Sequence, residues 1–144
     1  MQTSLTANTA ITITPMTAID FELFWPTFKS IVESRETYAF EPSIGYHEAY
    51  QLWCSLPQRS YIAKPIAKSD ADESEQEGRS MVLGSYYIKP NAAGPGSHIC
   101  NCGYMVAPEA RGKGVARALC LHSLQVAREL GYRAMQFNSV VSSN

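Results

Sequence analysis

The strongest constraint on the fold of this chain is a glycine-containing loop between an apolar strand and a long amphipathic helix. The stretch reads Val106-Ala107-Pro108-Glu109-Ala110-Arg111-Gly112-Lys113-Gly114-Val115-Ala116. Two glycines just before a helix let several backbone N–H groups face one anion, and the helix dipole adds partial positive charge at the same point. Arg111 and Lys113 strengthen that positive field. The loop therefore predicts a pyrophosphate site.

Two common phosphate-binding motifs do not fit this loop. The P-loop pattern GxxxxGK(S/T) is absent from it. A dinucleotide fingerprint, GxGxxG, would need a third glycine where this chain has Arg117, and no acidic residue closes the strand that follows. A third interpretation is the pyrophosphate loop of enzymes that bind acetyl-CoA.

Hydrophobic periodicity predicts the secondary structure of the rest of the chain. Period-two alternation predicts strands, and apolar residues at three- and four-residue spacing predict helices, the first of them capped by Asp20. The predicted strands cover 11–14, 59–66, 81–88, 98–106 and 134–141, and the predicted helices begin at 20, at 47 and at 115. The predicted order of elements is β-α-α-β-β-β-α-β.

Three successive strands joined by turns predict an antiparallel meander. The final strand–helix–strand unit should form a right-handed crossover, which makes its two strands parallel. We therefore predict an α/β (α+β) fold, a mixed and mostly antiparallel sheet flanked by helices. The polar segment 1–10 is predicted to be a disordered lead-in, and 11–144 to form one domain.

Composition argues against several classes of function. A net charge of −1 and the lack of a basic stripe argue against a nucleic-acid partner. The sequence has no apolar run long enough to span a bilayer and no signal-peptide pattern, so we expect no membrane partner and a cytoplasmic location. Four cysteines form neither a disulfide framework nor a CxxC pair, which predicts reduced core thiols and no metal site: Cys54, Cys100, Cys102 and Cys120.

The loop and the order of elements together resemble the GNAT superfamily of N-acetyltransferases. Residues 109–114 lie on the superfamily's cofactor motif, Q/R-x-x-G-x-G/A, with Glu109 in place of the usual Gln or Arg. This departure concerns a side chain, whereas such a loop binds mainly through backbone N–H groups. The resemblance extends over the chain after Ala10. It implies an acetyl-CoA-dependent N-acetyltransferase.

The resemblance also implies where acetyl-CoA would lie. The strand ending at Val106 would splay from the strand beginning near Ala134, and the pantetheine arm would lie between them against the backbone of Tyr104, Met105 and Val106. Asn144 matches an asparagine beside the thioester in similar enzymes. The pyrophosphate would lie in a cradle of loop and helix residues: Arg111, Gly112, Lys113, Gly114, Val115 and Ala116.

A narrower resemblance concerns the acceptor. Three short segments are similar to fungal acetyltransferases that act on proline analogues such as azetidine-2-carboxylate: Ile88-Lys89-Pro90-Asn91, Ser97-His98-Ile99-Cys100-Asn101 and Phe137-Asn138. Asn101 and Asn138 would bind the carboxylate of an amino-acid-like acceptor through their amide N–H groups, or would satisfy backbone groups freed where the strands part. Tyr38 and Phe40 would wall the acceptor site or would only pack in the core.

Other parts of the function stay open. A general base need only take a proton from an ammonium group through water, and the candidates are His98 and Glu41. Similar domains continue with another helix and two strands, so the resemblance implies a domain incomplete at its C-terminus, whose open strand edge a homodimer could cover. The preferred acceptor is the amine of a small molecule. The alternatives are a non-catalytic acyl-CoA-binding remnant or sensor, and a protein N-terminal or lysine acetyltransferase.

Overall fold

The computed structural model describes residues 10–34, 40–66, 82–91 and 98–141. Its helices and strands are β1 (Ile11–Pro15), α2 (Ala18–Glu33), α3 (Tyr46–Tyr50) followed directly by a π-helical turn (Gln51–Ser55), β2 (Arg59–Pro65), β3 (Gly84–Pro90), β4 (Ile99–Val106), α5 (Val115–Glu129) and β5 (Ala134–Val141). This order confirms the predicted β-α-α-β-β-β-α-β arrangement.

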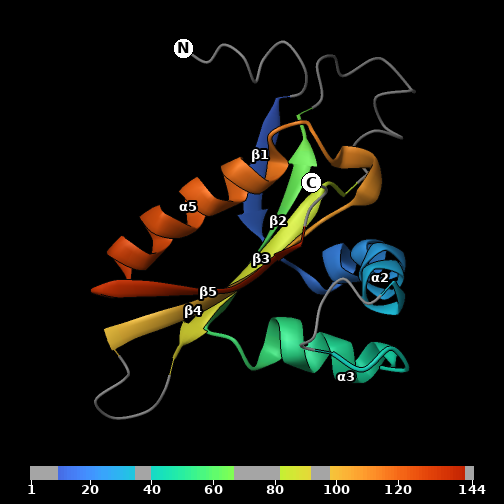
Figure 1. Cartoon of the computed structure of the whole chain (residues 1–144), viewed down its shortest axis with the longest axis horizontal. Coiled ribbons are helices and arrows are strands. Elements are labelled where there is room, and N and C mark those ends of the chain that lie inside the picture. The colour runs from blue at the N-terminus through green and yellow to red at the C-terminus, as the bar shows by residue number, and fades with distance from the viewer. Residues whose placement is uncertain (1–9, 35–39, 67–81, 92–97, 142–144) are drawn as a thin grey trace.

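The strands form a sheet in the order of the sequence, β1-β2-β3-β4-β5. Neighbouring strands are antiparallel from β1 to β4, and β5 is parallel to β4. Helix α5 covers one face of the sheet, and α2 and α3 cover the other (Figure 1). The predicted fold class is therefore confirmed. Within the described ranges, no helix is long and apolar enough to cross a membrane.

Helix α2 begins at Ala18 and is capped by Thr17, so the predicted cap at Asp20 is wrong. The Thr17 hydroxyl accepts a hydrogen bond from the Asp20 amide at 3.1 Å, and the Asp20 carboxylate accepts one from the Thr17 amide at 3.0 Å. Asp20 is therefore the third helical residue of a capping box. It also pairs with Lys64 of β2 at 2.7 Å, which ties the helix to the sheet.

Three tyrosines form a row across the sheet beneath α5. Tyr61, Tyr86 and Tyr104 occupy directly opposed positions of β2, β3 and β4, and their rings stack with centroids 5.2 and 5.6 Å apart. The Tyr86 hydroxyl lies 2.7 Å from His122 Nδ1, and the Tyr104 hydroxyl lies 2.6 Å from Ser123 Oγ. All three tyrosines are buried, so stacked rings and satisfied polar groups together fix α5 to the sheet.

Gly84 lets the start of α5 approach the sheet closely. A Cβ atom at this position would lie 2.7 Å from the Met105 carbonyl oxygen, 3.1 Å from Val115 and 3.2 Å from Leu119. The first distance is an overlap with backbone, which cannot rotate away as a side chain can. Gly84 therefore sets the distance between the sheet and the first turns of α5.

On the opposite face, Trp53 anchors the π-helical turn to the middle of the sheet. Its indole N–H donates to Ser85 Oγ at 2.8 Å, and that hydroxyl donates to the Tyr61 carbonyl at 2.6 Å. The indole also meets the Tyr87 ring edge to face, with centroids 4.9 Å apart. The core of this layer contains five buried aromatic side chains: Phe21, Phe24, Phe28, Trp53 and Tyr87.

The four cysteines lie in the structure as free thiols. Cys100 and Cys102 are buried on the α5 face of the sheet. Burial raises the pKa of Cys102 to about 12, so this thiol stays protonated. Among the residues that the structure describes, no group of three or more His, Cys, Asp or Glu side chains is placed to hold a metal ion.

We predict that the free energy of unfolding decreases as the pH falls below about 6.5 because His122 titrates there. Burial beside the tyrosine row, only partly opposed by the charge of Glu129, lowers the pKa of His122 in the folded protein. The unfolded chain therefore binds this proton more readily. The stability that His122 contributes is present above its unfolded pKa and is lost as the pH falls toward its folded pKa.

Chemical unfolding at about pH 5.5 and about pH 7.5 measures this effect. His122→Gln removes the titrating ring and should reduce the loss of stability between these two pH values. His47→Gln, at an exposed position of α3, is the matched control and should leave the loss unchanged. The same pH dependence in the original protein and in His122→Gln would contradict the prediction.

Candidate functional site

The glycine-containing loop lies where β4 ends and α5 begins. The Ala107 amide donates to the Leu83 carbonyl at 2.8 Å, which holds the start of the loop against the chain leading into β3. A short 3₁₀ turn, Pro108–Ala110, follows. Gly112 and Gly114 both have a φ of 82°, in the left-handed region that residues with a side chain disfavour. The two glycines therefore turn the chain onto the axis of α5.

The N-terminus of α5 lacks the side-chain cap that closes α2. Gly114 stands at the N-cap position and makes no side-chain hydrogen bond. The Ala118 amide donates to the Gly114 carbonyl at 3.0 Å, which is the first bond of the helical ladder. The preceding amides of Val115, Ala116 and Arg117 have no acceptor within the helix. These N–H groups and the positive end of the helix dipole face one region, as in an anion site.

Charged side chains add to this positive field. Arg111 is half-buried in the loop, and Lys113 is exposed between the two glycines. A Cβ atom on Gly112 would meet nothing within 4 Å, so the need for glycine here comes from φ and not from crowding within the loop. Residues 111–116, which the sequence predicted as a cradle, thus combine cations, left-handed glycines and amides that could hold a diphosphate.

The parallel pair of β4 and β5 contains one irregularity. A register shift between Cys102 and Gly103 leaves Asn138 of β5 as the extra residue. Pairing continues beyond the shift as far as Met105 of β4. The expected separation of the two strands is therefore wrong for this part of the sheet, because the ladder holds them together on both sides of the shift. Val106 is the first residue of β4 beyond its pairing with β5.

The surroundings of Asn101 differ from those that the sequence predicted. Its side-chain amide donates to Asn91 Oδ1 at 2.8 Å, so an N–H group of Asn101 is already in use. Its Oδ1 atom is buried and has no hydrogen-bond partner among the described residues. Leaving a buried acceptor unpaired costs about 1–3 kcal/mol. Among the described residues, the Asn101 side-chain atom with unmet hydrogen-bonding capacity is therefore an acceptor, which suits a donor N–H group.

Tyr87 and Gly103 make a close contact beside Asn101 that was not predicted from the sequence. The two residues lie directly opposite one another in β3 and β4. A Cβ atom on Gly103 would lie 2.5 Å from Tyr87 Cε2 and 2.9 Å from its hydroxyl oxygen. Glycine inside a strand marks a bulge or a close approach, and this signal was present in the sequence. At Gly103 the glycine coincides both with the register shift of the ladder and with the close approach of Tyr87.

The two base candidates lie on different elements. His98 is exposed just before β4, where its carbonyl accepts a hydrogen bond from the Arg133 amide at 2.9 Å. Glu41 is exposed before α3. Exposure keeps both side chains in contact with water, which a base acting through a water molecule requires.

Phe40 belongs to the aromatic layer of α2 and α3. Its ring lies 5.2 Å from that of Phe28 and 6.1 Å from that of Trp53, measured between centroids. Packing therefore accounts for this residue, whatever it contributes to an acceptor site. Tyr38 and Asn144 lie outside the described residues.

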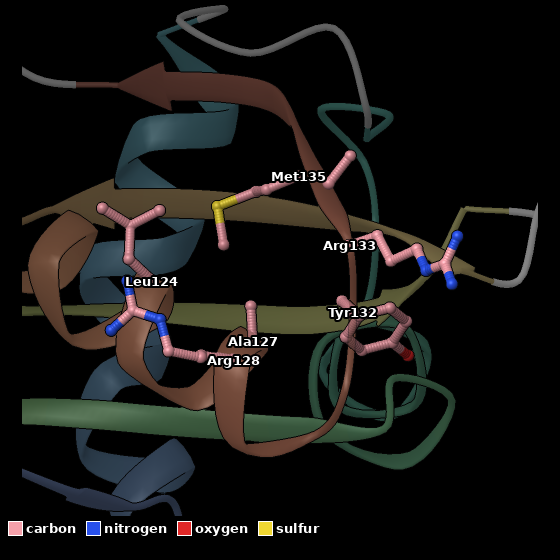
Figure 2. Close-up of a pocket in the computed structure, with 7 residues that line it drawn as sticks. Leu124, Ala127, Arg128, Tyr132, Arg133 and Met135 are labelled. Atoms are coloured by element: carbon pink, nitrogen blue, oxygen red, sulfur yellow. The ribbon is translucent and has the colours of Figure 1, made fainter.

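Two cavities lie away from the glycine loop. One, of about 190 Å³, lies between the C-terminal end of α5 and the start of β5 (Figure 2). The guanidinium groups of Arg128 and Arg133 point to opposite sides of it (Figure 2), so they do not converge on one anion. The other, of about 370 Å³, lies beside the end of β1 and the start of β2. The candidate site therefore rests on the loop and on β3 and β4, not on either cavity.

Known N-acetyltransferases are similar to this chain in sequence. Residues 21–144 match the model of the Acetyltransferase (GNAT) family. The N-acetyltransferase aca1 of Schizosaccharomyces pombe is 30% identical over 116 residues, which are 78% of this chain and 56% of that protein. The chain thus spans little more than half the length of this curated relative.

Solved structures share the fold. A GCN5-related N-acetyltransferase from Kribbella flavida is 37% identical, with a TM-score of 0.74, and the match covers 90% of this chain and 71% of that one. A GNAT superfamily phosphinothricin acetyltransferase from Sinorhizobium meliloti, solved with acetyl-CoA, is 21% identical, with a TM-score of 0.67 and coverage of 88% and 64%. With the family match over most of its length and the loop and sheet described above, the chain belongs to the acetyltransferase (GNAT) family.

Proposed function

We propose that this protein transfers the acetyl group of acetyl-CoA to the amine of a small, amino-acid-like molecule. The observation that carries the proposal is the uncapped N-terminus of α5, where two left-handed glycines and the first-turn amides form an anion site. Family membership supports acetyl-CoA as the donor, and a solved relative holds acetyl-CoA.

A thiol-release assay tests this proposal. The full chain is supplied with acetyl-CoA and a panel of α-amino acids, alkylamines and peptides, and the free thiol of CoA is measured. We expect turnover with α-amino acids. Acetyl-CoA binding without thiol release from any member of the panel would contradict the proposal and would favour a non-catalytic binding protein.

Each part of the site has a separate task in this proposal. Bound acetyl-CoA supplies the activated acetyl thioester. The amides of 112–116 hold its diphosphate, and Arg111 and Lys113 offset the negative charge. The backbone of Tyr104, Met105 and Val106 lines the pantetheine arm, which requires β5 to separate from β4 at this end, because the strands are paired as far as Met105. Backbone N–H groups aimed at the thioester carbonyl would stabilise the negative charge that develops there.

Asn101 orients the acceptor amine. Its buried Oδ1 accepts a hydrogen bond from an N–H group of the amine, which leaves the nitrogen lone pair free to face the thioester. The base that removes the ammonium proton, through water, is His98 or Glu41. The remaining residues of the proposed site line the acceptor or lie beside the thioester: Tyr38, Phe40, Asn138 and Asn144.

The location and the assembly of the protein are part of the same proposal. Four free thiols favour a reducing compartment, and we propose the cytoplasm. In the described sheet β5 is an edge strand, and unpaired backbone groups at a sheet edge favour pairing with another chain. We therefore propose a homodimer.

Gly112→Ala should weaken the binding of CoA about tenfold, the equivalent of one lost charge-assisted hydrogen bond. The alanine would shift φ away from 82° and turn neighbouring amides from the diphosphate. Gly131→Ala is the matched control, because Gly131 has a φ of 88° and equally open surroundings but lies at the other end of α5. Both variants should lose similar thermal stability. Equal CoA affinity of the two variants in a calorimetric titration would rule out the loop as the diphosphate site.

Asn101→Ala should lower kcat/KM for the acceptor by about 10- to 100-fold, because it removes the oxygen that holds the amine. The affinity for CoA should stay unchanged. Asn91→Ala is the control, since it removes the partner of the Asn101 amide but leaves Oδ1 in place. Steady-state kinetics of both variants measure the effect. Reduced thermal stability with unaltered acceptor kinetics would mean that Asn101 is structural.

A further inference from the structure

Lys89 of β3 lies directly opposite Asn101 of β4. Directly opposed residues share one face of a sheet, with Cβ atoms about 4.5–5.5 Å apart. For this pair the face is the one covered by α2 and α3, because the Lys89 ammonium lies over the ring of Tyr87, 5.5 Å from its centroid. Lys89 is half-buried, and its ammonium lies over the Tyr87 ring on the face of the sheet that Asn101 shares.

The charge of Lys89 has no carboxylate partner among the described residues. The lysines that form ion pairs there are Lys29, with Glu33, and Lys64, with Asp20. The aromatic face of Tyr87 attracts the ammonium, but it does not occupy all three N–H donors. Lys89 therefore keeps the capacity to bind an anion.

Lys89 and Asn101 present hydrogen-bonding groups of opposite character. Asn101 Oδ1 is a buried acceptor without a described partner, and Lys89 is a charged donor without a carboxylate. An α-amino acid carries the complementary groups close together, an amine N–H that donates and a carboxylate that accepts. We propose that Lys89 binds the carboxylate of the acceptor and thereby selects α-amino acids, while Asn101 Oδ1 receives the amine. This inference rests on the proposed acetyl transfer.

Two other classes of acceptor fit this charge less well. A diamine would bring its second ammonium group toward Lys89, and like charges repel strongly in a partly buried site; a lysine side chain offers no carboxylate to pair with Lys89. A peptide N-terminus has a neutral amide where an amino acid has its carboxylate, so it would leave the ammonium unpaired. The positive charge of Lys89 also disfavours the protonated form of a nearby amine, and the neutral form is the nucleophile.

The test compares an α-amino acid with its own carboxamide, which keeps the amine and loses the negative charge. The probes are L-alanine and L-proline, each beside its carboxamide. Lys89→Met keeps an aliphatic chain over Tyr87 and removes the charge. Lys29→Met, at an exposed position of α2, is the matched control. KM and kcat are measured at saturating acetyl-CoA, and amino-acid binding is measured by calorimetry in the presence of CoA.

Lys89→Met should raise KM for the amino acid about 10- to 100-fold and change kcat by less than about threefold. For the carboxamide, KM should change by less than about threefold. Lys29→Met should behave as the original protein does. Equal losses with acid and carboxamide, or no loss with either, would overturn the role of Lys89 and leave acetyl transfer standing.

Calorimetry separates this inference from the proposed function because it needs no turnover. If the amino acid binds and Lys89→Met weakens that binding, the inference about Lys89 holds. If no thiol is released in the same protein, only the proposed acetyl transfer fails. If the original protein binds neither L-alanine nor L-proline in the presence of CoA, the inference is overturned.

Discussion

The close packing of α5 against the sheet is the constraint on which the rest of the structure depends. Gly84 lets the first turns of the helix reach the sheet, and the hydroxyls of Tyr86 and Tyr104 hold its middle through His122 and Ser123. A helix held at both places cannot rotate about its axis without leaving buried polar groups unpaired, at about 1–3 kcal/mol each. The core therefore fixes the direction of the N-terminal amides relative to the end of β4.

The two faces of the sheet differ in how fully their polar groups are satisfied. On the α5 face the tyrosine row is bonded to the helix, and on the other face Trp53 donates to Ser85, which donates to the Tyr61 carbonyl. Among the described residues, hydrogen-bonding capacity remains at Asn101 Oδ1 and at the Lys89 ammonium. A core gains nothing from such groups, whereas a binding site needs them. This contrast supports the proposal that the acceptor binds on the α2 and α3 side of the sheet.

The glycine loop and the order of elements could be predicted because their signals are local. Two glycines before a run of helical period mark the start of α5, and period-two alternation marks the strands. Features that depend on register could not be predicted. Periodicity shows which face a residue shares, but it does not show which residue of the next strand lies opposite. For this reason the contact of Gly84 with α5, the contact of Gly103 with Tyr87 and the pairing of Lys89 with Asn101 appear only in the structure.

The length of β4 links the two halves of the candidate site. Asn101 and Val106 are five positions apart in β4, which is about 16 Å at 3.3 Å per residue. In the proposed function, a donor that fills the anion site and also reaches an amine held by Asn101 must therefore be long and extended, with its charge at one end and its reactive group at the other. The register shift at Gly103 lies along this path, where the ladder with β5 is already interrupted. In the proposed function, separation of the strands would begin at this shift, and the opened edge of β4 would give an extended donor a path toward Asn101.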